Sequence, residues 1–369
     1  MTIYLVQVFL ILLMSAGLHP ASNEKGKRRF LFLSFALLTI VSGIRGYTVG
    51  ADTKVYVRWY ENIDYIAINN GRFEAGFTLF MKALHKISSN PSFLLFISSI
   101  VCIGTFCVFA NRYSKKPTIS VLLYVLLGSY FSQMNIMRQS LALSITMWSF
   151  MLILDDREIE LHSLRRVVIS ALLILLATSF HTIAAVCFIA WVLLIRQGQI
   201  EDKTKLTMQW AVMRMLLIAG IFFVAYSVVM RLVIAILPWY ANYFYGTWSD
   251  SNYFASLFKM LISVVFLIVG SFVLRGRKLT NAQRFSVIML GLNIVFQVLA
   301  MRMEIWGRIA SLFGIYTYLL WVPEFLNEIQ LRNNRRIIEF AITGFSFLYM
   351  LIVLVFRPEW TLVVPYVIK

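Results

Sequence analysis

The feature that most constrains this chain is a series of apolar runs, each about as long as a membrane-spanning helix, that continues from end to end. A helix needs about 20 mainly apolar residues to cross the hydrocarbon core of a bilayer. Backbone N–H and C=O groups find no water inside lipid, so segments of this length cross as helices. With 60% hydrophobic and only 14% charged residues, the composition agrees. The sequence therefore predicts an all-α, polytopic integral membrane protein with one transmembrane domain over residues 1–369.

The spacing of these runs predicts about twelve transmembrane helices. The first run, TIYLVQVFLILLMSAGL, has no basic region before it and no small-residue cleavage site, so we expect it to be retained as a span. The expected spans are residues 2–18, 30–44, 92–110, 119–134, 140–154, 167–180, 182–195, 211–237, 256–274, 285–301, 309–325 and 337–356.

Residues 167–195 determine the topology, because they form 29 residues without Lys, Arg, Asp or Glu. One helix of this length would be about 43 Å long, more than the bilayer core requires. Two short or re-entrant helices meeting near residues 179–181 place six basic loops on one side, with 20 of the 34 Lys and Arg residues. A single crossing would remove that bias, so the positive-inside rule favours two crossings, with both termini outside. The six loops are 19–29, 111–118, 155–166, 196–210, 275–284 and 326–336.

The same topology places the remaining polar segments on the outer face. The net charge of +17 comes from the basic loops, which indicates membrane orientation rather than a nucleic-acid partner. The cytoplasmic loops contain no glycine-rich phosphate loop and no DxD carboxylate pair, so we expect neither ATP nor nucleotide-sugar chemistry. The three cysteines lie inside apolar runs, which argues against disulfides and a zinc site. We expect extracytoplasmic chemistry with no metal and no cofactor.

The longest outer segment, 45–91, contains an apolar pattern with helical spacing. It predicts an amphipathic helix that lies in the membrane interface. Arg45 follows a span, where an arginine can extend to the lipid headgroups or bind a ligand. Asp52 and Glu74 lie farther along, and a solvated face explains them equally well. The apolar residues of the pattern are Phe73, Phe77, Phe80, Met81, Leu84 and Ile87.

Arg138 is the only charge between Lys116 and Asp155, and it lies in the short gap NIMRQ with Asn135 and Gln139. An ionisable residue at this depth is costly and usually faces a water-filled cavity or a partner. Contact with headgroups and the binding of an anionic ligand are both consistent with this position.

His181 lies at the expected break in the 167–195 segment. A packed histidine with satisfied hydrogen bonds is one interpretation. Irregular backbone at membrane depth needs a protein-lined cavity, however, and this favours a functional role.

Two further outer segments carry candidate ligand-binding groups. In MRMEIWGR, Arg302 and Arg308 could form a phosphate clamp, or Glu304 could pair with them internally. Residues 238–255 have no Lys or Arg and are rich in aromatic residues. They predict either an interfacial aromatic belt or a platform on which sugars stack.

Four stretches, in this order, resemble the EpsG-like group of Wzy-type polysaccharide polymerases. They are RGYTVGADTKVY, FEAGFTLF, NIMRQSLALSI and LLATSFHTIAAV, and the similarity covers about residues 40–190. Two positions after the histidine, such proteins often have a small hydroxyl residue, whereas this chain has Ile183. The matching residues are Arg45, Asp52, Tyr56, Glu74, Gly76, Phe77, Asn135, Arg138, Gln139 and His181.

The resemblance implies a bacterial cytoplasmic-membrane enzyme with a GT-C-like helix arrangement. Such an enzyme joins oligosaccharide repeat units carried on undecaprenyl pyrophosphate and has its active site on the outer face. The resemblance also implies that the enzyme is a glycosyltransferase that needs no metal. Its expected partners are the lipid-linked oligosaccharide and membrane lipids, with a chain-length regulator and a flippase as further candidates.

In this scheme Arg138 binds the lipid pyrophosphate, and Arg45 or the Arg302/Arg308 pair makes a second contact. Asp52, Glu74 and His181 are the candidate general bases, and we favour His181 because a helix break can place it beside Arg138. Alternative functions are an O-antigen-ligase-like transferase, a membrane acyltransferase and a transporter of lipid-linked oligosaccharides. The remaining expected substrate-binding residues are Tyr56, Asn135, Gln139 and Glu304.

Overall fold

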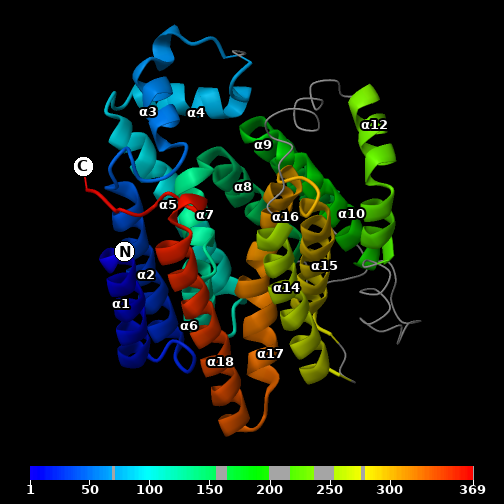
Figure 1. Ribbon diagram of the computed structural model, residues 1–369. Coiled ribbons are helices and arrows are strands. Elements are labelled where there is room, and N and C mark those ends of the chain that lie inside the picture. Colours follow the sequence, from blue (N-terminus) through cyan, green and yellow to red (C-terminus); the bar gives the residue numbers. More distant parts are fainter. Residues whose placement is uncertain (69–70, 155–163, 199–216, 237–252, 276–278, 369) are drawn as a thin grey trace. The chain divides into compact units, whose positions relative to one another are not determined.

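The computed structural model describes residues 1–68, 71–154, 164–198, 217–236, 253–275 and 279–368. These residues are mainly helical and contain no strand, only an isolated antiparallel bridge between Arg45 and Ile368 (Figure 1). The all-α prediction is confirmed. The chain divides into two compact units, which are described separately. The first is Met1–Glu158, His162–Phe188 and Ile329–Lys369, and the second is Ile159–Leu161 and Ile189–Glu328.

The helices of the first unit begin at polar residues or prolines that suit helix starts. Asn23 and Asn90 accept backbone N–H bonds from Lys25 and Ser92, and Pro91 and Pro117 each open a helix. The elements are α1 (Thr2–Leu18), α2 (Glu24–Gly43), α3 (Thr53–Glu61), η1 (Ile63–Tyr65), α4 (Ala75–His85), α5 (Pro91–Tyr113), α6 (Pro117–Leu126), α7 (Ser129–Asn135), α8 (Met137–Leu154), α9 (Leu164–Phe180), η2 (Thr182–Val186), α18 (Arg332–Leu351), η5 (Ile352–Phe356) and η6 (Pro358–Trp360).

Among the described residues, six helices are long and apolar enough to cross a membrane. A bent pair, α6 with α7, has the same character across a 50° bend and would make a seventh span or a re-entrant loop. Two shorter apolar helices are Thr2–Leu18 and Thr182–Ile195. The chain is therefore a multi-pass membrane protein. The six are Pro91–Tyr113, Met137–Leu154, Tyr253–Val273, Asn281–Ala300, Ile305–Glu328 and Arg332–Phe356.

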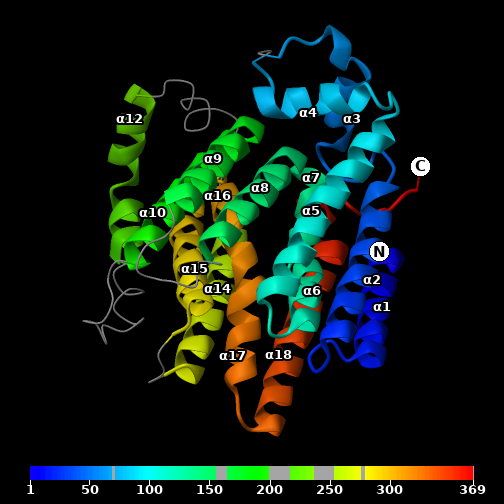
Figure 2. The same ribbon diagram turned by 180° about the vertical axis from the view of Figure 1, so that it is seen from behind.

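Three of the basic loops lie at one end of the first unit. The hydroxyls of Ser15 and Thr118 are 2.7 Å apart, which joins the end of α1 to the start of α6. Lys116 Nζ is 2.8 Å from Glu339 Oε1 of α18. These contacts bring loops 19–29, 111–118 and 326–336 together, while α3 and α4 lie at the opposite end of the unit (Figure 2). This is the grouping that the loop charges predict.

Two helix breaks lie close to the positions expected from the sequence. Between α7 and α8 the break is a single residue, Ile136, so Arg138 lies in the first turn of α8 rather than in a loop. The gap is shorter than predicted because α8 begins at Met137. α9 ends at Phe180, and His181 has an extended backbone, with φ −157° and ψ 120°, before η2 begins.

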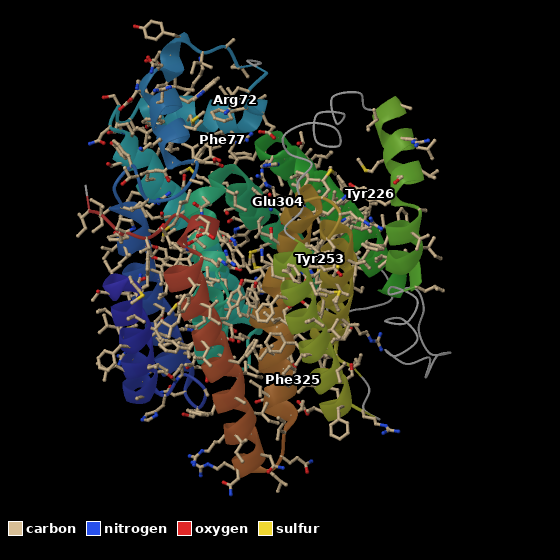
Figure 3. The ribbon with its side chains drawn as sticks, in the orientation of Figure 1. Arg72, Phe77, Tyr226, Tyr253, Glu304 and Phe325 are labelled. Atoms are coloured by element: carbon tan, nitrogen blue, oxygen red, sulfur yellow. The ribbon has the colours of Figure 1, made fainter. Side chains whose placement is uncertain are left out.

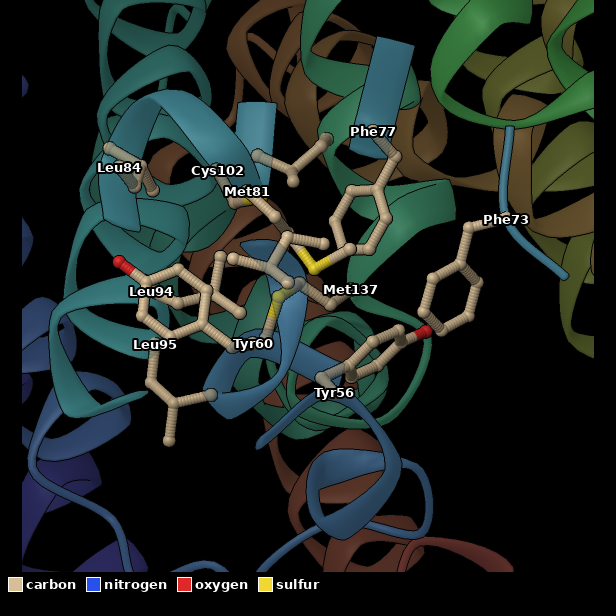
Figure 4. Close-up of a cluster of buried hydrophobic side chains, with 12 residues drawn as sticks. Tyr56, Tyr60, Phe73, Phe77, Met81, Leu84, Leu94, Leu95, Cys102 and Met137 are labelled. Carbon is tan, nitrogen blue, oxygen red and sulfur yellow. The ribbon is translucent and has the colours of Figure 1, made fainter. Parts of the chain in front are cut away.

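The expected amphipathic helix is present as α4, but its apolar stripe packs on protein. Phe77 and Met81 are fully buried in a cluster with Tyr60 of α3 and Leu95 of α5 (Figure 4). Figure 3 shows Phe77 and Arg72 at the α3–α4 end of the unit. The stripe therefore reflects a local protein core, and the placement of α4 in the membrane interface stays a prediction.

The second unit is held together by tightly packed helices. Gly270 of α14 lies against the indole of Trp321, whose Nε1 donates to the Phe266 carbonyl at 2.8 Å. The buried Gln283 side chain donates to Glu324 at 3.1 Å. Its elements are α12 (Tyr226–Ile236), α14 (Tyr253–Val273), α15 (Asn281–Ala300), α16 (Ile305–Tyr316), the π-helical η4 (Thr317–Trp321) and α17 (Val322–Glu328), and α10 (Cys187–Gly198) enters it from the first unit.

Residues 357–368, here called the C-terminal strap, return to the α3–α4 end of the first unit. They run beside the loop after α2, and hydrogen bonds from widely separated parts of the chain fix them. The sequence did not predict this segment, because its contacts join residues more than 300 positions apart. The bonds are Gly46 N–H to Val367 O (2.7 Å), Gly50 N–H to Leu362 O (2.7 Å), Tyr366 OH to Val41 O (2.7 Å) and Tyr4 OH to Val363 O (3.0 Å).

Candidate functional site

Glu74, Arg138 and His181 come together in the first unit, and Glu74 is the central member. Its Oε2 accepts a hydrogen bond from Arg138 Nη1 in a close ion pair. Its Oε1 accepts the backbone N–H of Thr182 at 3.1 Å and is 3.8 Å from His181 Nδ1. The side chains of His181, Glu74 and Arg138 are 14%, 17% and 22% exposed, so the cluster is largely shielded from solvent.

Each of the three residues lies at or just before the start of a helix. Glu74 immediately precedes α4 without capping it, so its side chain is available to other elements. Arg138 is in the first turn of α8, and Thr182 opens η2 after the break. An amide at a helix start has no intrahelical partner, and a carboxylate is favourable there. Glu74 therefore links the start of α8 to the start of η2.

Gly76 allows α4 to approach the end of α9. A Cβ at this position would be 2.2 Å from Ser179 Oγ and 2.8 Å from the Ser179 carbonyl oxygen, closer than real Cβ atoms come. Any side chain would therefore push α4 away from α9. The glycine places Glu74 within reach of the Thr182 amide.

Aromatic residues surround the Arg138 guanidinium. Its Cζ lies 4.7 Å from the ring centroid of Phe73, within the range of a cation–π contact. Tyr56 lies beside Phe73 in Figure 4, and its ring meets that of Phe77 edge to face. Burial raises the pKa of Tyr56, the Asp52 charge raises it further, and Arg138 lowers it. Tyr56 is therefore a neutral hydroxyl at physiological pH, next to both charges.

One donor of Arg138 has no protein partner. Its Nε is buried and makes no hydrogen bond within the described part of the chain. A buried, unsatisfied N–H group costs about 1–3 kcal/mol and calls for an explanation. A ligand that accepts a hydrogen bond from this Nε–H would explain why the donor is left without a protein partner.

The loop before α3 is fixed to the α7–α8 junction. Asn135 Oδ1 accepts the Ala51 N–H at 2.6 Å, and Thr53 Oγ1 donates to the Met134 carbonyl at 3.2 Å. Gly50 has φ +98°, and a Cβ there would lie 2.5 Å from the same carbonyl oxygen. These contacts position Asp52, which is half-buried one turn before Tyr56. Asn135 thus contacts main chain, and the nearby Gln139 is buried.

Arg45 is almost completely buried, at 2% exposure. Its guanidinium donates to the Ser42 carbonyl near the end of α2 and, at 3.4 Å, to the Met134 carbonyl near the end of α7. Cations at helix C-termini satisfy free carbonyls and interact favourably with the helix dipole. In this structure Arg45 therefore ties two helix ends together beneath the C-terminal strap.

The second unit contains the other predicted arginines. Arg302 is exposed, and its Cζ lies 4.2 Å from the centroid of Phe223. Glu304, labelled in Figure 3, is exposed at the position before α16, and Arg308 is half-buried inside that helix. Most of the aromatic-rich segment lies outside the described residues. Of its aromatic residues, only Tyr253 and Phe254 are described, and they lie at the start of α14. The described residues contain no group of three His, Cys, Asp or Glu residues arranged to hold a metal ion.

Sequence reasoning missed several parts of this site. It did not identify the Thr182 amide or the stacking of Phe73 on Arg138, and it gave no reason for Gly76. A glycine two residues after a candidate carboxylate was a usable signal for close helix contact. The C-terminal strap had no such signal.

A family model described as the EpsG family matches residues 28–368, nearly the whole chain. The chain belongs to the EpsG family. This is a family of Wzy-type polymerases, so the resemblance is confirmed, and it extends well beyond residues 40–190. Searches of curated proteins and of solved structures found no match. EpsG membership indicates a glycosyltransferase-like polysaccharide polymerase of exopolysaccharide synthesis.

The four stretches that resemble the EpsG family meet at one end of the first unit. Ala51 contacts Asn135, Glu74 pairs with Arg138, and Glu74 also accepts the amide beside His181. These contacts join parts of the chain that are 64 to 108 residues apart. Their convergence makes this cluster the candidate active site.

Proposed function

We propose that the chain is a metal-independent glycosyltransferase that joins undecaprenyl-pyrophosphate-linked repeat units into a surface polysaccharide. An acceptor hydroxyl forms a bond to the anomeric carbon of the donor sugar, and the bond from that carbon to the pyrophosphate oxygen breaks. The hydroxyl proton passes to a base, and negative charge develops on the pyrophosphate. EpsG membership supplies the reaction class, and the Glu74 cluster supplies groups suited to these steps.

Arg138 is the proposed contact for the pyrophosphate, and its unsatisfied Nε–H is the observation that carries the proposal. A guanidinium has five donors, so Nη1 can stay on Glu74 while another edge binds a phosphate oxygen. The position over Phe73 fixes the plane of this group. One preorganised donor at developing negative charge is typically worth about 3–4 kcal/mol of activation free energy.

Glu74 and Asp52 are the carboxylates available as the base for the acceptor hydroxyl. Glu74 is next to Arg138 and is held on both oxygens, which favours it. Asp52 is near Tyr56, so this tyrosine and Asp52 form the second side of the proposed site. A positioned base contributes typically about 10²–10⁴-fold in rate. Pyrophosphate is already a good leaving group, so the scheme needs no metal.

The other candidate residues take supporting roles. Asn135 and Arg45 hold the loop and the helix ends beside the site, and Gln139 and Tyr56 complete its wall. Arg302 and Arg308, with Glu304, stay proposed contacts for a phosphate on the second unit.

We further propose about twelve crossings, a GT-C-like arrangement and a site on the outer face of the bacterial cytoplasmic membrane. One observation, together with the positive-inside rule, supports this orientation. Three basic loops lie at the end of the first unit opposite to the site, and basic loops stay in the cytoplasm. A flippase would supply the lipid-linked units, and a chain-length regulator is a candidate partner.

The first test is deletion of the gene in its source bacterium, followed by separation of surface glycan and lipid-linked oligosaccharide by length. We expect long chains to collapse to single repeat units, with lipid-linked single units retained. Long chains that have lost a decoration would instead indicate an acyltransferase. Long chains that stay on lipid would indicate a ligase. Either result would overturn the polymerase.

The second test complements the deletion with variants of Arg138. We expect Arg138→Lys to restore little polymer, because lysine binds phosphate only as a point charge. Arg112→Lys, on the exposed end of α5 near the basic loops, is the matched control and should restore full-length glycan. Full activity of Arg138→Lys would show that no bidentate contact exists.

A further inference from the structure

The contacts of the His181 ring indicate which of its two nitrogens carries the proton. His181 is the residue before η2, and its Nδ1 accepts the backbone N–H of Ile183 at 3.3 Å. A backbone N–H can only donate, so Nδ1 presents a lone pair. A neutral imidazole with an accepting Nδ1 carries its proton on Nε2.

The position of Glu74 agrees with this tautomer. Glu74 Oε1 is 3.8 Å from His181 Nδ1, beyond hydrogen-bond distance, and takes the Thr182 N–H instead. Two acceptors, the carboxylate and Nδ1, thus use two successive backbone amides of η2. If the ring gains a second proton, it gains it at Nδ1, beside the Glu74 carboxylate. In both states Nε2 keeps its hydrogen.

We infer that His181 donates a hydrogen bond from Nε2–H to the pyrophosphate leaving group and does not act as the base. This differs from the role that the sequence favoured. It rests on the proposed function, because the acceptor of the bond is the pyrophosphate of that reaction. Glu74 contacts both Arg138 and the His181–Thr182 segment, so Arg138 and His181 are neighbours of the same carboxylate. A pyrophosphate has oxygens on two adjacent phosphorus atoms, so one pyrophosphate can accept hydrogen bonds from both residues.

Amide substitutions separate the two ring nitrogens. The amide nitrogen of glutamine is as many bonds from Cα as Nε2 of histidine, and the amide oxygen of asparagine corresponds to Nδ1. His181→Gln therefore keeps the donor and loses the group that accepts the Ile183 N–H. His181→Asn keeps that acceptor, in a residue well suited to precede a helix, and loses the Nε2 donor.

The experiment measures polymerisation of purified lipid-linked repeat units by the full-length protein in vesicles, with thermal stability of each variant as a folding control. We expect His181→Gln to stay within about 10-fold of the wild type and His181→Asn to fall by about 10²–10³-fold, the usual cost of one such donor. Asparagine and glutamine variants that are equally inactive, each by about 10²–10⁴-fold, would show that the ring is the base and overturn the inference. An active asparagine variant with an inactive glutamine variant would assign only a structural role to Nδ1 and would also overturn it. A wild-type protein that does not polymerise these units would instead refute the proposed function.

Discussion

Substitution of Gly76 by alanine tests whether the approach of α4 to α9 builds the site. The added Cβ would lie 2.2 Å from Ser179 Oγ and 2.8 Å from the Ser179 carbonyl oxygen. Normal non-bonded carbon contacts are about 3.5–4.0 Å, so relief of the carbonyl contact alone requires a displacement of about 1 Å. The serine side chain could rotate, but the carbonyl is part of the α9 backbone and cannot.

The displacement acts directly on the carboxylate. Glu74 is two residues from Gly76, and its Oε1 is 3.1 Å from the Thr182 N–H. A shift of about 1 Å breaks this bond, and misplacement of that size in an active site can cost about 10²-fold in rate. Overpacking costs about 1–3 kcal/mol of stability, which most domains tolerate. We therefore expect Gly76→Ala to fold and to lose about 10²-fold of its polymerase activity.

The assay is glycan chain length in the deletion strain, together with rates on purified lipid-linked units. Gly344→Ala in α18 is the matched control, because its Cβ would meet nothing within 4 Å. Ser179→Ala in the Gly76→Ala background removes the nearest atom but leaves the carbonyl, so it should recover activity only in part. If Gly76→Ala polymerised at the wild-type rate, the reasoning that α4 must lie against α9 would be refuted.

Three other expectations follow from the same contacts. Glu74→Gln keeps the shape of the side chain but leaves the Arg138 charge unpaired, so we expect a loss of about 10²-fold or more in rate, and a rate near wild type would exclude Glu74 as the base. Asn135→Ala removes the acceptor of the exposed Ala51 N–H, which water can then solvate, and should lower the free energy of unfolding by about 0.5–1.5 kcal/mol, measured by thermal unfolding in detergent. Deletion of residues from 361 onward removes the part of the C-terminal strap that bonds to Gly46 and Gly50, so a cysteine placed at Ala51 should react faster with a maleimide, and an unchanged rate would show that this part of the strap does not order the loop.

Local sequence patterns predicted the all-α class and the long apolar helices, because hydropathy acts within one segment. The break at His181 and the short gap before Arg138 were both visible as interruptions in apolar runs. The contacts within the site were not visible, because they depend on which segments meet. Glu74 and Thr182 are 108 residues apart, and contacts between α4 and the end of α9, such as Gly76 with Ser179, bring them together.

Arg45 is a second residue whose partners could not be predicted from its own segment. Its type and position predicted a headgroup or ligand contact, which is the usual reason for an arginine at the end of a span. In the folded chain its donors go to the carbonyls of Ser42 and Met134, and its burial depends partly on the strap that bridges it at Ile368. A residue's own segment cannot reveal a partner that is supplied by the far end of the sequence.

The Glu74–Arg138 pair also explains why an arginine, rather than a lysine, suits this position. A partly buried cation is costly when it is unpaired, and Glu74 lowers this cost by compensating the Arg138 charge. A lysine could pair with the carboxylate or with a phosphate, but it offers one charged centre to both. The guanidinium is a rigid fork, so one edge can remain on Glu74 while Nε–H is left for the pyrophosphate of the proposed reaction. In the proposed reaction, pyrophosphate binding would add a partner to Arg138 without removing Glu74, which would stay in place for the acceptor hydroxyl.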